Sequence, residues 1–394
     1  MKKQTQAIHL EYERRDAYDS LSVPVYNTLA YEFDNAAVMA EAFTDKIKAP
    51  DYSRVENPTV TNLERRVAAL TDAAHANAFN SGMAAISNTL MALAAQGKNI
   101  VTSKHLFGNT YALLVATLRR FGVKVRLRDL TNIETVREAI DDDTCCVFLE
   151  ILTNPQLEVA DLKAISEVAH EKNVPLVVDS TVIPFTQFSA KSLGVDIEVV
   201  SSSKYVSGGA TSLGGLVIDY GTPYNGDFAK RLYGEMLFNF GAYMTPQVAY
   251  MQTIGLETLD ARYRVQSSNA LELAKKLRSL PQIKLVNYVG LEDNPYHELA
   301  QRQFGKTAGA MICIDLESKE ACFSFLNNLK LIHRATNLFD NRSLAIHPAS
   351  TIFGAFSENM RKSMDVKDTT IRLSIGLEDV DDLFEDIKQA IDSL

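Results

Sequence analysis

Lys204 stands behind an apolar run and three serines, in "DIEVVSSSKYVSGG" (196–209). Partial burial lowers the pKa of a lysine, because burial disfavours the charged ammonium. A neutral amine can attack a carbonyl and form a Schiff base. Lys204 is therefore a candidate nucleophile; the alternative is a solvated lysine in a glycine-containing loop.

Asp179 closes another apolar run, "VPLVVDS" (174–180), at a position 25 residues before Lys204. A site with one amine and one carboxylate suits pyridoxal 5'-phosphate (PLP), which acts as an electron sink when a carboxylate keeps its ring nitrogen protonated. The simpler interpretation of Asp179 is a turn residue after a strand. Together the two residues favour a cofactor site.

Two stretches could bind a phosphate. The hydroxyls of Ser201 and Ser203 flank Lys204, and "NSGMAAISNTLMAL" (80–93) places Gly82 in a tight turn before a predicted helix. The free N–H groups and the dipole of a helix start attract anions. Sugar and nucleotide phosphates would fit this turn equally well, and an ordinary helix cap remains an alternative.

The elements that must position these residues alternate between strand and helix patterns. Such alternation predicts an α/β fold with a mostly parallel sheet covered on both faces. In open sheets of this kind, ligands bind outside the carboxyl ends of the strands. The expected strands are 98–104, 144–150, 174–180 and 196–202, and the expected helices include 62–77 and 159–173.

The pattern of predicted strands and helices changes after a long predicted helix over 258–280. A smaller mixed segment follows, with a strand expected over 309–316 and an amphipathic helix over 378–394. We therefore place a domain boundary near residue 255. The length of 394 residues is ample for two domains with full cores.

Composition excludes several classes of function. A formal net charge of −9 without a dense basic run argues against DNA or RNA as partners. The four cysteines have neither zinc-site spacing nor a disulfide framework, so no metal is expected. No apolar stretch approaches a membrane-spanning length, and a cytoplasmic enzyme or binding protein is the default expectation.

The chain resembles the Cys/Met-metabolism PLP enzymes, the family of cystathionine γ-synthases and lyases, methionine γ-lyase and O-acetylhomoserine sulfhydrylase. The resemblance runs nearly end to end and rests on nine blocks in the order of the family. They are "YSRVENPTVTNLERRVAAL", "NSGMAAI", "LFGNTYALL", "ILTNPQLEVADL", "VVDST", "SSSKYVSGGATSLGG", "GLETLDAR", "SLAIHPAST" and "RLSIGLED".

The resemblance implies the PLP-dependent transferase fold of type I, similar to aspartate aminotransferase. Its parts would be an N-terminal arm (1–50) that reaches a neighbouring subunit, a large PLP-binding domain (51–255) and a smaller α+β C-terminal domain (256–394). Family members are usually tetramers built from catalytic dimers, so the resemblance implies a homotetramer.

The resemblance also implies the roles of individual residues. Lys204 would carry the cofactor and then move protons, Asp179 would pair with the ring nitrogen, and Asn154 would bind the ring hydroxyl. Arg372 would clamp the substrate carboxylate through its bidentate fork, and Ser343 would help orient it. The remaining cofactor residues would be Gly82, Met83, Ser201 and Ser203 at the phosphate, Phe107 and Thr181 near the ring, and Tyr52 and Arg54 from a neighbouring subunit.

Simpler interpretations stay open for the outlying residues. Arg372 could form a surface ion pair with the acidic stretch "EDVDD", and Tyr52 and Arg54 could belong to an ordinary loop. His347, in "IHPAS", is more typical of a hydrogen-bonded structural histidine, and we leave it out of catalysis.

Two positions depart from the pattern of the family. Phe107 stands where many members have a tyrosine, so it keeps ring stacking without a hydroxyl, and proton transfer must fall to Lys204, water or a tyrosine such as Tyr111. Asn109 stands where methionine γ-lyases have a cysteine, which weakens the lyase hypothesis. The form of the lysine block is closer to the sulfhydrylases.

The leading hypothesis is γ-replacement on O-acetyl-L-homoserine, with sulfide, a thiol or a sulfur carrier as donor and L-homocysteine as product. Cystathionine γ-synthase and a γ- or β-lyase are the alternatives. A phosphate-binding α/β protein without PLP is a remote one, since neither G-x-G-x-x-G nor G-x-x-x-x-G-K-[ST] is present. A further alternative is a member of the family that has little catalytic activity and is retained as a binding or regulatory protein. The acyl group, the sulfur donor and the working oligomer are left open.

Overall fold

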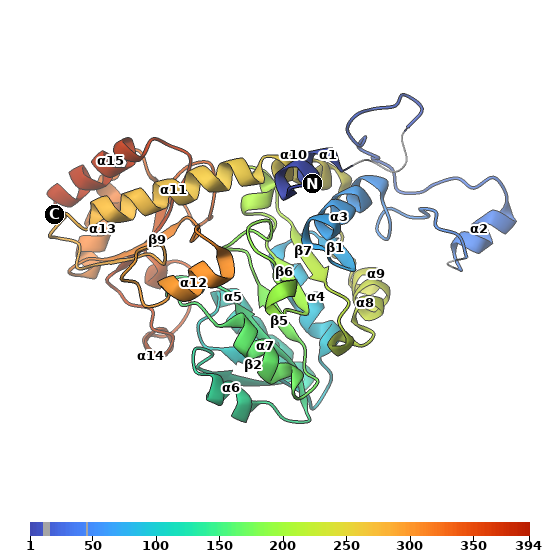
Figure 1. Cartoon of the computed structure of the whole chain (residues 1–394), viewed down its shortest axis with the longest axis horizontal. Coiled ribbons are helices and arrows are strands. Elements are labelled where there is room, and N and C mark those ends of the chain that lie inside the picture. Colours follow the sequence, from blue (N-terminus) through green and yellow to red (C-terminus); the bar gives the residue numbers. More distant parts are fainter. Residues whose placement is uncertain (11–15, 45) are drawn as a thin grey trace.

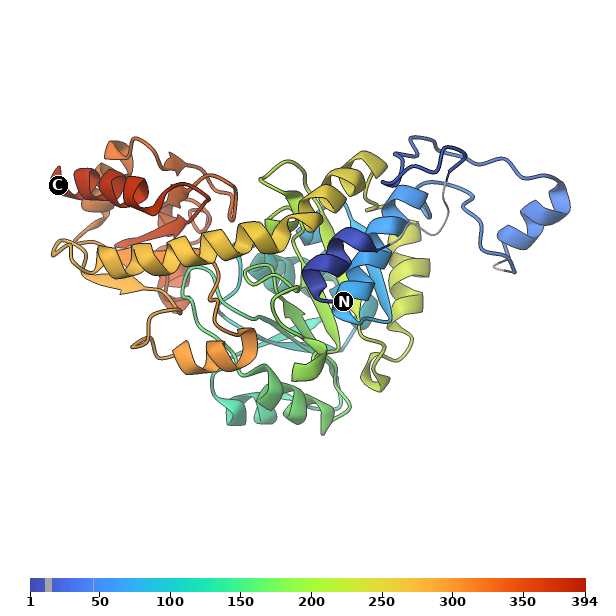
Figure 2. The same ribbon diagram turned by 45° about the horizontal axis from the view of Figure 1, so that its top comes forward.

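The computed structural model describes residues 1–10, 16–44 and 46–394. Two sheets organise these residues, and the long helix α11 (Leu259–Leu277) runs from the part that holds the first sheet to the part that holds the second (Figures 1 and 2). The larger sheet positions the residues that the sequence singles out.

The larger sheet has seven strands in the order β1-β7-β6-β5-β4-β2-β3. Strand β7 is antiparallel to both of its neighbours, while the pairs from β6 to β3 are parallel. The strands are β1 (His75–Phe79), β2 (Asn99–Ser103), β3 (Lys124–Arg128), β4 (Thr144–Glu150), β5 (Leu176–Asp179), β6 (Ile197–Val200) and β7 (Gly215–Asp219).

Both faces of this sheet are buried, as its apolar strands predict. In β4, for example, Cys146 and Phe148 face one hydrophobic cluster while Val147 and Leu149 face the other. Side chains alternate between the two faces of a strand, so a run apolar at every position suits a strand covered on both sides. Helices α3 (Pro58–Thr71), α6 (Ile133–Ala139) and α7 (Leu162–His170) contribute to the first cluster, and α4 (Gly82–Leu93), α5 (Gly108–Ala112) and α8 (Phe228–Arg231) to the second.

The smaller sheet lies in the C-terminal part of the chain and has the order β10-β11-β12-β9-β8. Apart from the parallel pair β10–β11, its pairs are antiparallel. The prediction of a large, mostly parallel sheet followed by a smaller mixed unit is confirmed. The elements are β8 (Leu285–Asn287), β9 (Met311–Asp315), β10 (His333–Arg334), β11 (Leu344–Ile346), β12 (Thr370–Ser374), α12 (His297–Phe304), α13 (Lys319–Asn328), α14 (Glu358–Ser363) and α15 (Val380–Asp392).

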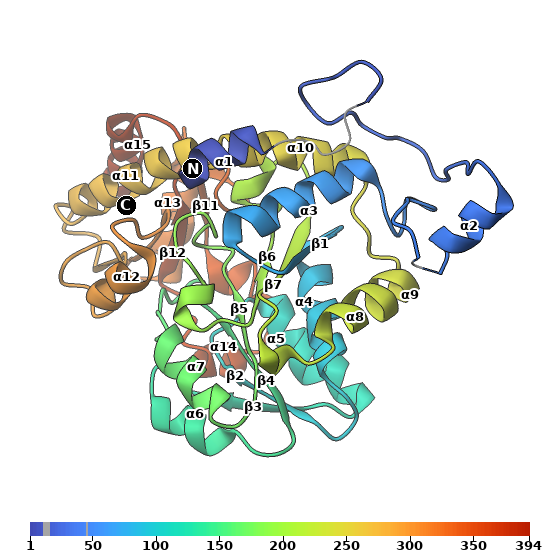
Figure 3. The same cartoon turned by 45° about the vertical axis from the view of Figure 1, so that its right-hand side comes forward.

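Part of the N-terminal stretch before α3 extends away from this body (Figure 1). Helix α1 (Lys3–His9) packs on it, but α2 (Ala36–Ala42) projects to one side in all three ribbon views (Figures 1–3). None of the side chains of α2 is buried, and the apolar side chains of Met39 and of Phe43, which follows α2, are exposed.

The remaining elements are short helices and turns and the helix before α11. They are α9 (Phe238–Phe240), α10 (Pro246–Glu257), π-helical η1 (Leu113–Thr117) and η6 (Leu232–Leu237), and the 3-10 turns η2 (Leu118–Phe121), η3 (Lys191–Leu193), η4 (Tyr205–Ser207), η5 (Pro223–Asn225) and η7 (Pro348–Ser350).

The largest difference between the structure and the expected helix ends lies at the end of α3. The helix expected over 62–77 stops at Thr71, because Asp72 adopts a left-handed conformation (φ 55°), and β1 begins at His75. The domain boundary near residue 255 stays a prediction; α10 and α11 meet at Thr258. Across the described residues, no helix combines the length and apolar character that crossing a membrane requires.

Candidate active site

Three neighbouring strands deliver the candidate residues to one edge of the large sheet. Strand β4 ends at Glu150, β5 ends at Asp179, and β6 leads directly into the serines before Lys204. The register pairs Glu150 with Asp179 and Asp179 with Val199, so all three strand ends are level. The parallel arrangement thus brings the two carboxyl groups and the Lys204 turn to the same side of the fold.

The Lys204 amine lies in a largely buried position. Its Nζ donates a hydrogen bond to Asn337 Oδ1 at 2.7 Å. Burial, with a smaller contribution from the nearby positive charge of Arg372, lowers the pKa of Lys204 to about 8. A substantial neutral fraction near neutral pH is what a nucleophilic or proton-transferring amine requires.

Arg372 lies on β12 of the smaller sheet and is 2% exposed, so the surface ion pair considered for it is excluded. Its guanidinium donates to Asn154 Oδ1 (3.3 Å) and to the carbonyls of Thr336 (3.2 Å) and Asn337 (3.3 Å). Burial lowers the pKa of Arg372 to about 10, which still leaves it charged at neutral pH. Its Nε is buried and, among the described residues, has no hydrogen-bond partner. A buried cation of this kind favours binding of an anion.

Asp179 and Glu150 form a pair of acids at the adjoining strand ends. The Asp179 carboxylate accepts the N–H of Thr181 at 2.9 Å, and burial raises the pKa of Asp179. Glu150 accepts the N–H of Phe107 at 2.5 Å, and burial together with the charge of Asp179 raises the pKa of Glu150 to about 8. Since two buried carboxylates cannot both be charged cheaply, a cationic group beside Asp179 would stabilise this pair.

The turn after β1 and the turn after β6 pack closely enough to form a cradle. A Cβ built on Gly82 would lie 2.6 Å from both Cβ and Oγ of Ser201, so a side chain larger than hydrogen does not fit there. Ser81 caps α4 by accepting the N–H of Ala84, and helix geometry leaves the N–H groups of Gly82 and Met83 without an intrahelical acceptor. Thr181 Oγ1 accepts the N–H of Ser201 at 2.8 Å and joins this cradle to Asp179.

The structure brings most of the predicted residues into this region. Phe107 immediately precedes α5 and donates its N–H to Glu150, and Asn154 accepts a hydrogen bond from Arg372. The hydroxyl of Ser203 is engaged with the backbone of Gly214 as both donor (3.1 Å) and acceptor (2.9 Å), so its predicted phosphate contact would require a rearrangement. The roles assigned to these residues stay predictions.

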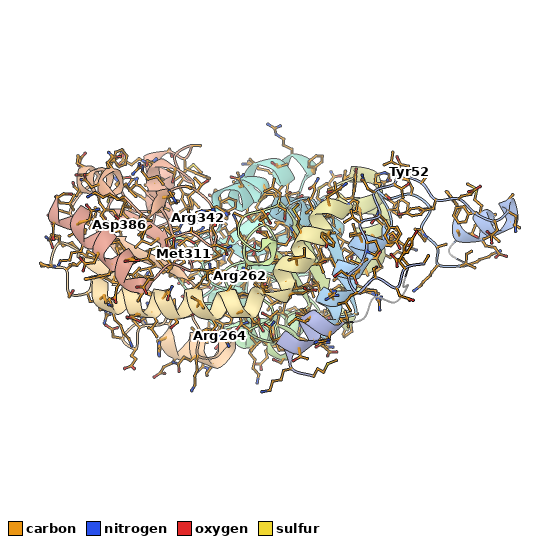
Figure 4. All side chains as sticks on the ribbon, turned by 90° about the horizontal axis from the view of Figure 1, so that it is seen from above. Tyr52, Arg262, Arg264, Met311, Arg342 and Asp386 are labelled. Atoms are coloured by element: carbon orange, nitrogen blue, oxygen red, sulfur yellow. The ribbon has the colours of Figure 1, made fainter. Side chains whose placement is uncertain are left out.

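Three predicted residues make other contacts within this chain. Ser343 is fully buried and its hydroxyl binds Glu378 (2.8 Å) and the N–H of Gly376 (2.9 Å), which gives no support to its predicted contact with a substrate. Arg54 lies over the ring of Tyr52 (5.5 Å) and donates to the Phe238 carbonyl. Figure 4 shows Tyr52 at the end that carries the arm, well apart from Arg262 of α11, whose guanidinium binds the Tyr205 carbonyl beside Lys204.

Sequence reasoning missed Asn337 and Glu150. Asn337 meets Lys204 and Arg372 from an irregular segment 133 residues away from Lys204 in the chain, which no local pattern reveals. Glu150 could have been found, because it closes the strand "TCCVFLE" at the same sheet edge as Asp179. His347 binds Ser350 and the Asp368 carbonyl, in agreement with its structural interpretation.

These residues fit PLP. The cradle at Gly82 and Ser201 suits a phosphate, Asp179 suits a protonated ring nitrogen, and the Lys204 amine suits the aldehyde. The unpartnered Nε of Arg372 suits a carboxylate, which an amino-acid substrate would carry.

We predict that Gly82→Ala weakens cofactor binding. The added methyl group would meet Ser201 at 2.6 Å, so the two turns must separate and the cradle must open. We expect the Kd for PLP to rise about tenfold or more, measured by absorbance titration of cofactor-free protein. Gly234→Ala is the matched control, because its Cβ would meet nothing within 4 Å. Equal affinities in the two variants would contradict the cradle.

We predict that Glu150→Gln flattens the pH dependence of stability. Because the pKa of Glu150 rises from 4.5 to about 8 on folding, the folded state holds a proton that the unfolded chain releases. The free energy of unfolding therefore falls as pH rises through this window, by something on the order of a few kcal/mol. Glutamine has no such proton, so urea unfolding of the cofactor-free variant should show a smaller decrease.

Glu64→Gln is the control for Glu150→Gln. Burial also raises the pKa of Glu64 to about 8, and Glu64 accepts the N–H of Ala78 (2.8 Å) on β1, four strands away from the β4 strand that carries Glu150. Both variants should flatten the stability profile, but only Glu150→Gln should change the pH dependence of PLP affinity. A Glu150→Gln profile that matches that of the unmodified protein would show that Glu150 is ionised in the folded state.

Comparison with known proteins gives long matches. A family model described as Cys/Met metabolism PLP-dependent enzyme matches residues 4–392. L-methionine gamma-lyase of Fusobacterium nucleatum subsp. polymorphum is 37% identical over 99% of this chain and 98% of its own. O-acetyl-L-homoserine sulfhydrylase of Corynebacterium glutamicum is 31% identical over 98% of this chain and 95% of its own.

The solved structures include a close match. The crystal structure of a provisionally assigned O-acetylhomoserine (thiol)-lyase from Campylobacter jejuni superposes with a TM-score of 0.95 at 35% identity, and the match covers 100% of both chains. That structure carries N'-pyridoxyl-lysine-5'-monophosphate at its position 205. These matches confirm the resemblance and the predicted fold.

Proposed function

Because the chain belongs to the Cys/Met metabolism PLP-dependent enzymes, we propose that it catalyses γ-replacement on O-acetyl-L-homoserine, with sulfide or a small thiol as the nucleophile. Its cofactor is PLP, as in the rest of the family. When bound, PLP withdraws electrons from Cα of an amino acid and so makes its proton acidic. The product with sulfide would be L-homocysteine, and acetate would leave.

Lys204 would bind the cofactor and then move protons on the substrate. A modified lysine at position 205 of the Campylobacter jejuni protein, in a match that spans both chains, supports this role for Lys204. With a pKa of about 8, the released amine could accept the proton from Cα of the substrate near neutral pH. Asp179 would hold the ring nitrogen protonated, and Ser201 with the start of α4 would bind the phosphate.

Arg372 and Asn337 would orient the substrate. The Arg372 guanidinium offers the charge that binds an α-carboxylate, and Asn337 contacts both cations: its backbone carbonyl accepts from Arg372 and its Oδ1 accepts from Lys204. Loss of a second proton at Cβ would let acetate leave Cγ with its bonding electron pair. The hydrosulfide ion, HS⁻, would then donate a lone pair to Cγ, and the two protons would return to Cβ and Cα, so that overall one C–O bond is exchanged for one C–S bond and acetate leaves.

The observation that carries replacement over elimination is Asn109, which stands where the methionine γ-lyases have a cysteine. The second candidate is methionine γ-elimination, and it is favoured by the relative of 37% identity that has this activity in its name. Elimination from methionine would need water in place of the thiol and would release methanethiol, ammonia and 2-oxobutanoate.

The test is a product assay on purified protein loaded with PLP. We expect homocysteine from O-acetyl-L-homoserine and sulfide, with 2-oxobutanoate as a minor product. Rapid 2-oxobutanoate formation from L-methionine, without homocysteine in the first reaction, would favour the lyase. A protein that stays colourless with PLP would overturn both candidates.

We further propose that the site is completed by a second copy of the chain, within a homotetramer. Within the arm (1–50), the part that carries α2 projects from the body (Figure 1), and Leu21 (99%) and Leu29 (65%) are exposed. An exposed apolar segment of this kind suits burial against another subunit. Tyr52 and Arg54, at the base of the arm, would then reach the phosphate of the neighbouring subunit. The division at residue 255 into a large and a C-terminal domain belongs to the same proposal.

A further inference from the structure

An irregular segment, 335–343, carries Asn337 to Lys204; its centre is buried, whereas Ala335, Thr336 and Arg342 are exposed. It joins β10 to β11, and Leu338, Phe339 and Asp340 are all less than a tenth exposed. The buried backbone N–H and C=O groups of a segment without regular secondary structure must bond to side chains or to other segments, so these contacts fix the position of the segment. Those contacts decide where the Asn337 amide lies.

Phe339 holds an unusual backbone conformation at the centre of this segment. Its φ is +58°, in the left-handed region that a bulky residue rarely adopts. Such strain persists only where the surroundings hold the residue in place. The N–H of Phe339 donates to Ser374 Oγ at 2.7 Å, at the end of the strand that carries Arg372.

The Phe339 ring stacks on the residue that follows Lys204. The rings of Phe339 and Tyr205 are 4.1 Å apart between centroids and inclined by only 7°, and Tyr263 packs edge-on against Tyr205 at 5.3 Å. The contact therefore bridges the two stretches of chain whose side chains, Lys204 and Asn337, are hydrogen-bonded to each other. Further along, Asn341 donates to the Gly208 carbonyl at 3.2 Å.

We propose that the Tyr205–Phe339 stack is a clamp that positions Asn337 and the acceptors of Arg372 against Lys204, and that Phe339 is a positioning residue for the reaction. This proposal rests on the proposed function, in which Lys204 and Arg372 act on the substrate. The strained conformation of Phe339 is held because the stack and the Ser374 hydrogen bond fix it from two sides. Without the ring, the segment would be free to move away from Lys204 and water could reach the amine.

The central variant is Phe339→Gly. Glycine adopts a φ of +58° without strain, so this change removes the ring and leaves the backbone conformation accessible. Phe339→Ala removes the ring and keeps the strain, and it should show larger effects in the same direction. Tyr205→Phe keeps the stacked ring and should behave as the unmodified protein does, whereas Tyr205→Leu should follow Phe339→Gly.

The first measurement uses cofactor-free protein and does not depend on catalysis. Lys204 is labelled with acetic anhydride over a range of pH, and the modified peptide is quantified by mass spectrometry. In Phe339→Gly, entry of water should raise the pKa of Lys204 toward its ordinary value. A rise of one pKa unit would lower the neutral fraction of Lys204 by about tenfold at pH values below its pKa.

The second measurement is steady-state kinetics. The KM for O-acetyl-L-homoserine should rise about tenfold, the change expected for one displaced charged contact.

Phe325→Ala is the control for the loss of a buried ring. Phe325 is also fully buried, but on α13, away from Lys204. It should lower Tm without changing the labelling profile of Lys204 or KM. If Phe339→Gly lowers Tm in the same way and leaves both readouts unchanged, the ring only fills space and the proposal is wrong. If the unmodified protein converts no substrate but its labelling profile still shifts on Phe339→Gly, the clamp stands and the proposed function fails.

Discussion

Lys204→Ala is expected to abolish turnover, with a loss of about a thousandfold or more, the range that general acid–base catalysis contributes. The variant lacks the amine that would join the cofactor and the group that would carry the proton from Cα. Purified protein should also lose the visible absorbance of a lysine-bound cofactor. The measurement is kcat with O-acetyl-L-homoserine and sulfide, together with the spectrum. The exposed Lys172→Ala is the matched control and should keep both.

Replacement of Lys204 by methionine should change the stability of the protein in a defined direction. The pKa of Lys204 falls from 10.5 to about 8 on folding, so the unfolded chain binds more protons between these values and stability rises with pH across that window. Below it, the folded protein carries the cost of a buried ammonium, up to about 3 kcal/mol. Cofactor-free Lys204→Met should therefore be more stable than the unmodified protein at pH 7, and this advantage should vanish above about pH 10. An advantage that is constant with pH would show that Lys204 is not buried as a cation.

The elements of the large sheet could be predicted because their signal is local. Strands such as 144–150 are apolar at nearly every position, and only a sheet covered on both faces buries such a run. The strand ends then placed Asp179 and Lys204 at one edge by topology alone. The end of α3 could not be predicted in this way, since the helical pattern of the sequence continues past Asp72, where the backbone turns to a left-handed conformation.

The part of the site contributed by the C-terminal segment could not be derived from spacing. Arg372 enters from another sheet, and Asn337 enters from a segment whose course depends on a strained Phe339 and a stack on Tyr205. Ser343 shows the limit of transferring roles by motif, because it lies six residues from Asn337 but its hydroxyl is committed to Glu378. Contacts between distant segments are set by tertiary packing, which a motif does not encode.

Arg372→Leu is expected to raise KM for the amino-acid substrate by about a hundredfold or more, since loss of a buried charged hydrogen-bonding partner costs roughly 2 to 5 kcal/mol. The carboxylate that Arg372 would bind keeps its charge throughout the reaction. Its contribution is therefore nearly equal in the bound substrate and in the transition state, and kcat should fall much less than KM rises. Steady-state kinetics with O-acetyl-L-homoserine as the varied substrate separate the two parameters.

Two further variants make the result specific to the guanidinium of Arg372. Arg372→Lys keeps the charge but loses the planar fork that binds a carboxylate through two N–H groups, so its KM should lie between the other values. Arg264→Leu removes an exposed arginine of α11 and should leave KM unchanged (Figure 4). If Arg372→Leu lowers kcat with KM intact, Arg372 acts on the reacting atoms through Asn337 and Lys204, and the carboxylate must bind elsewhere. An intact KM with an intact kcat would leave its contacts with Asn154, Thr336 and Asn337 as purely structural.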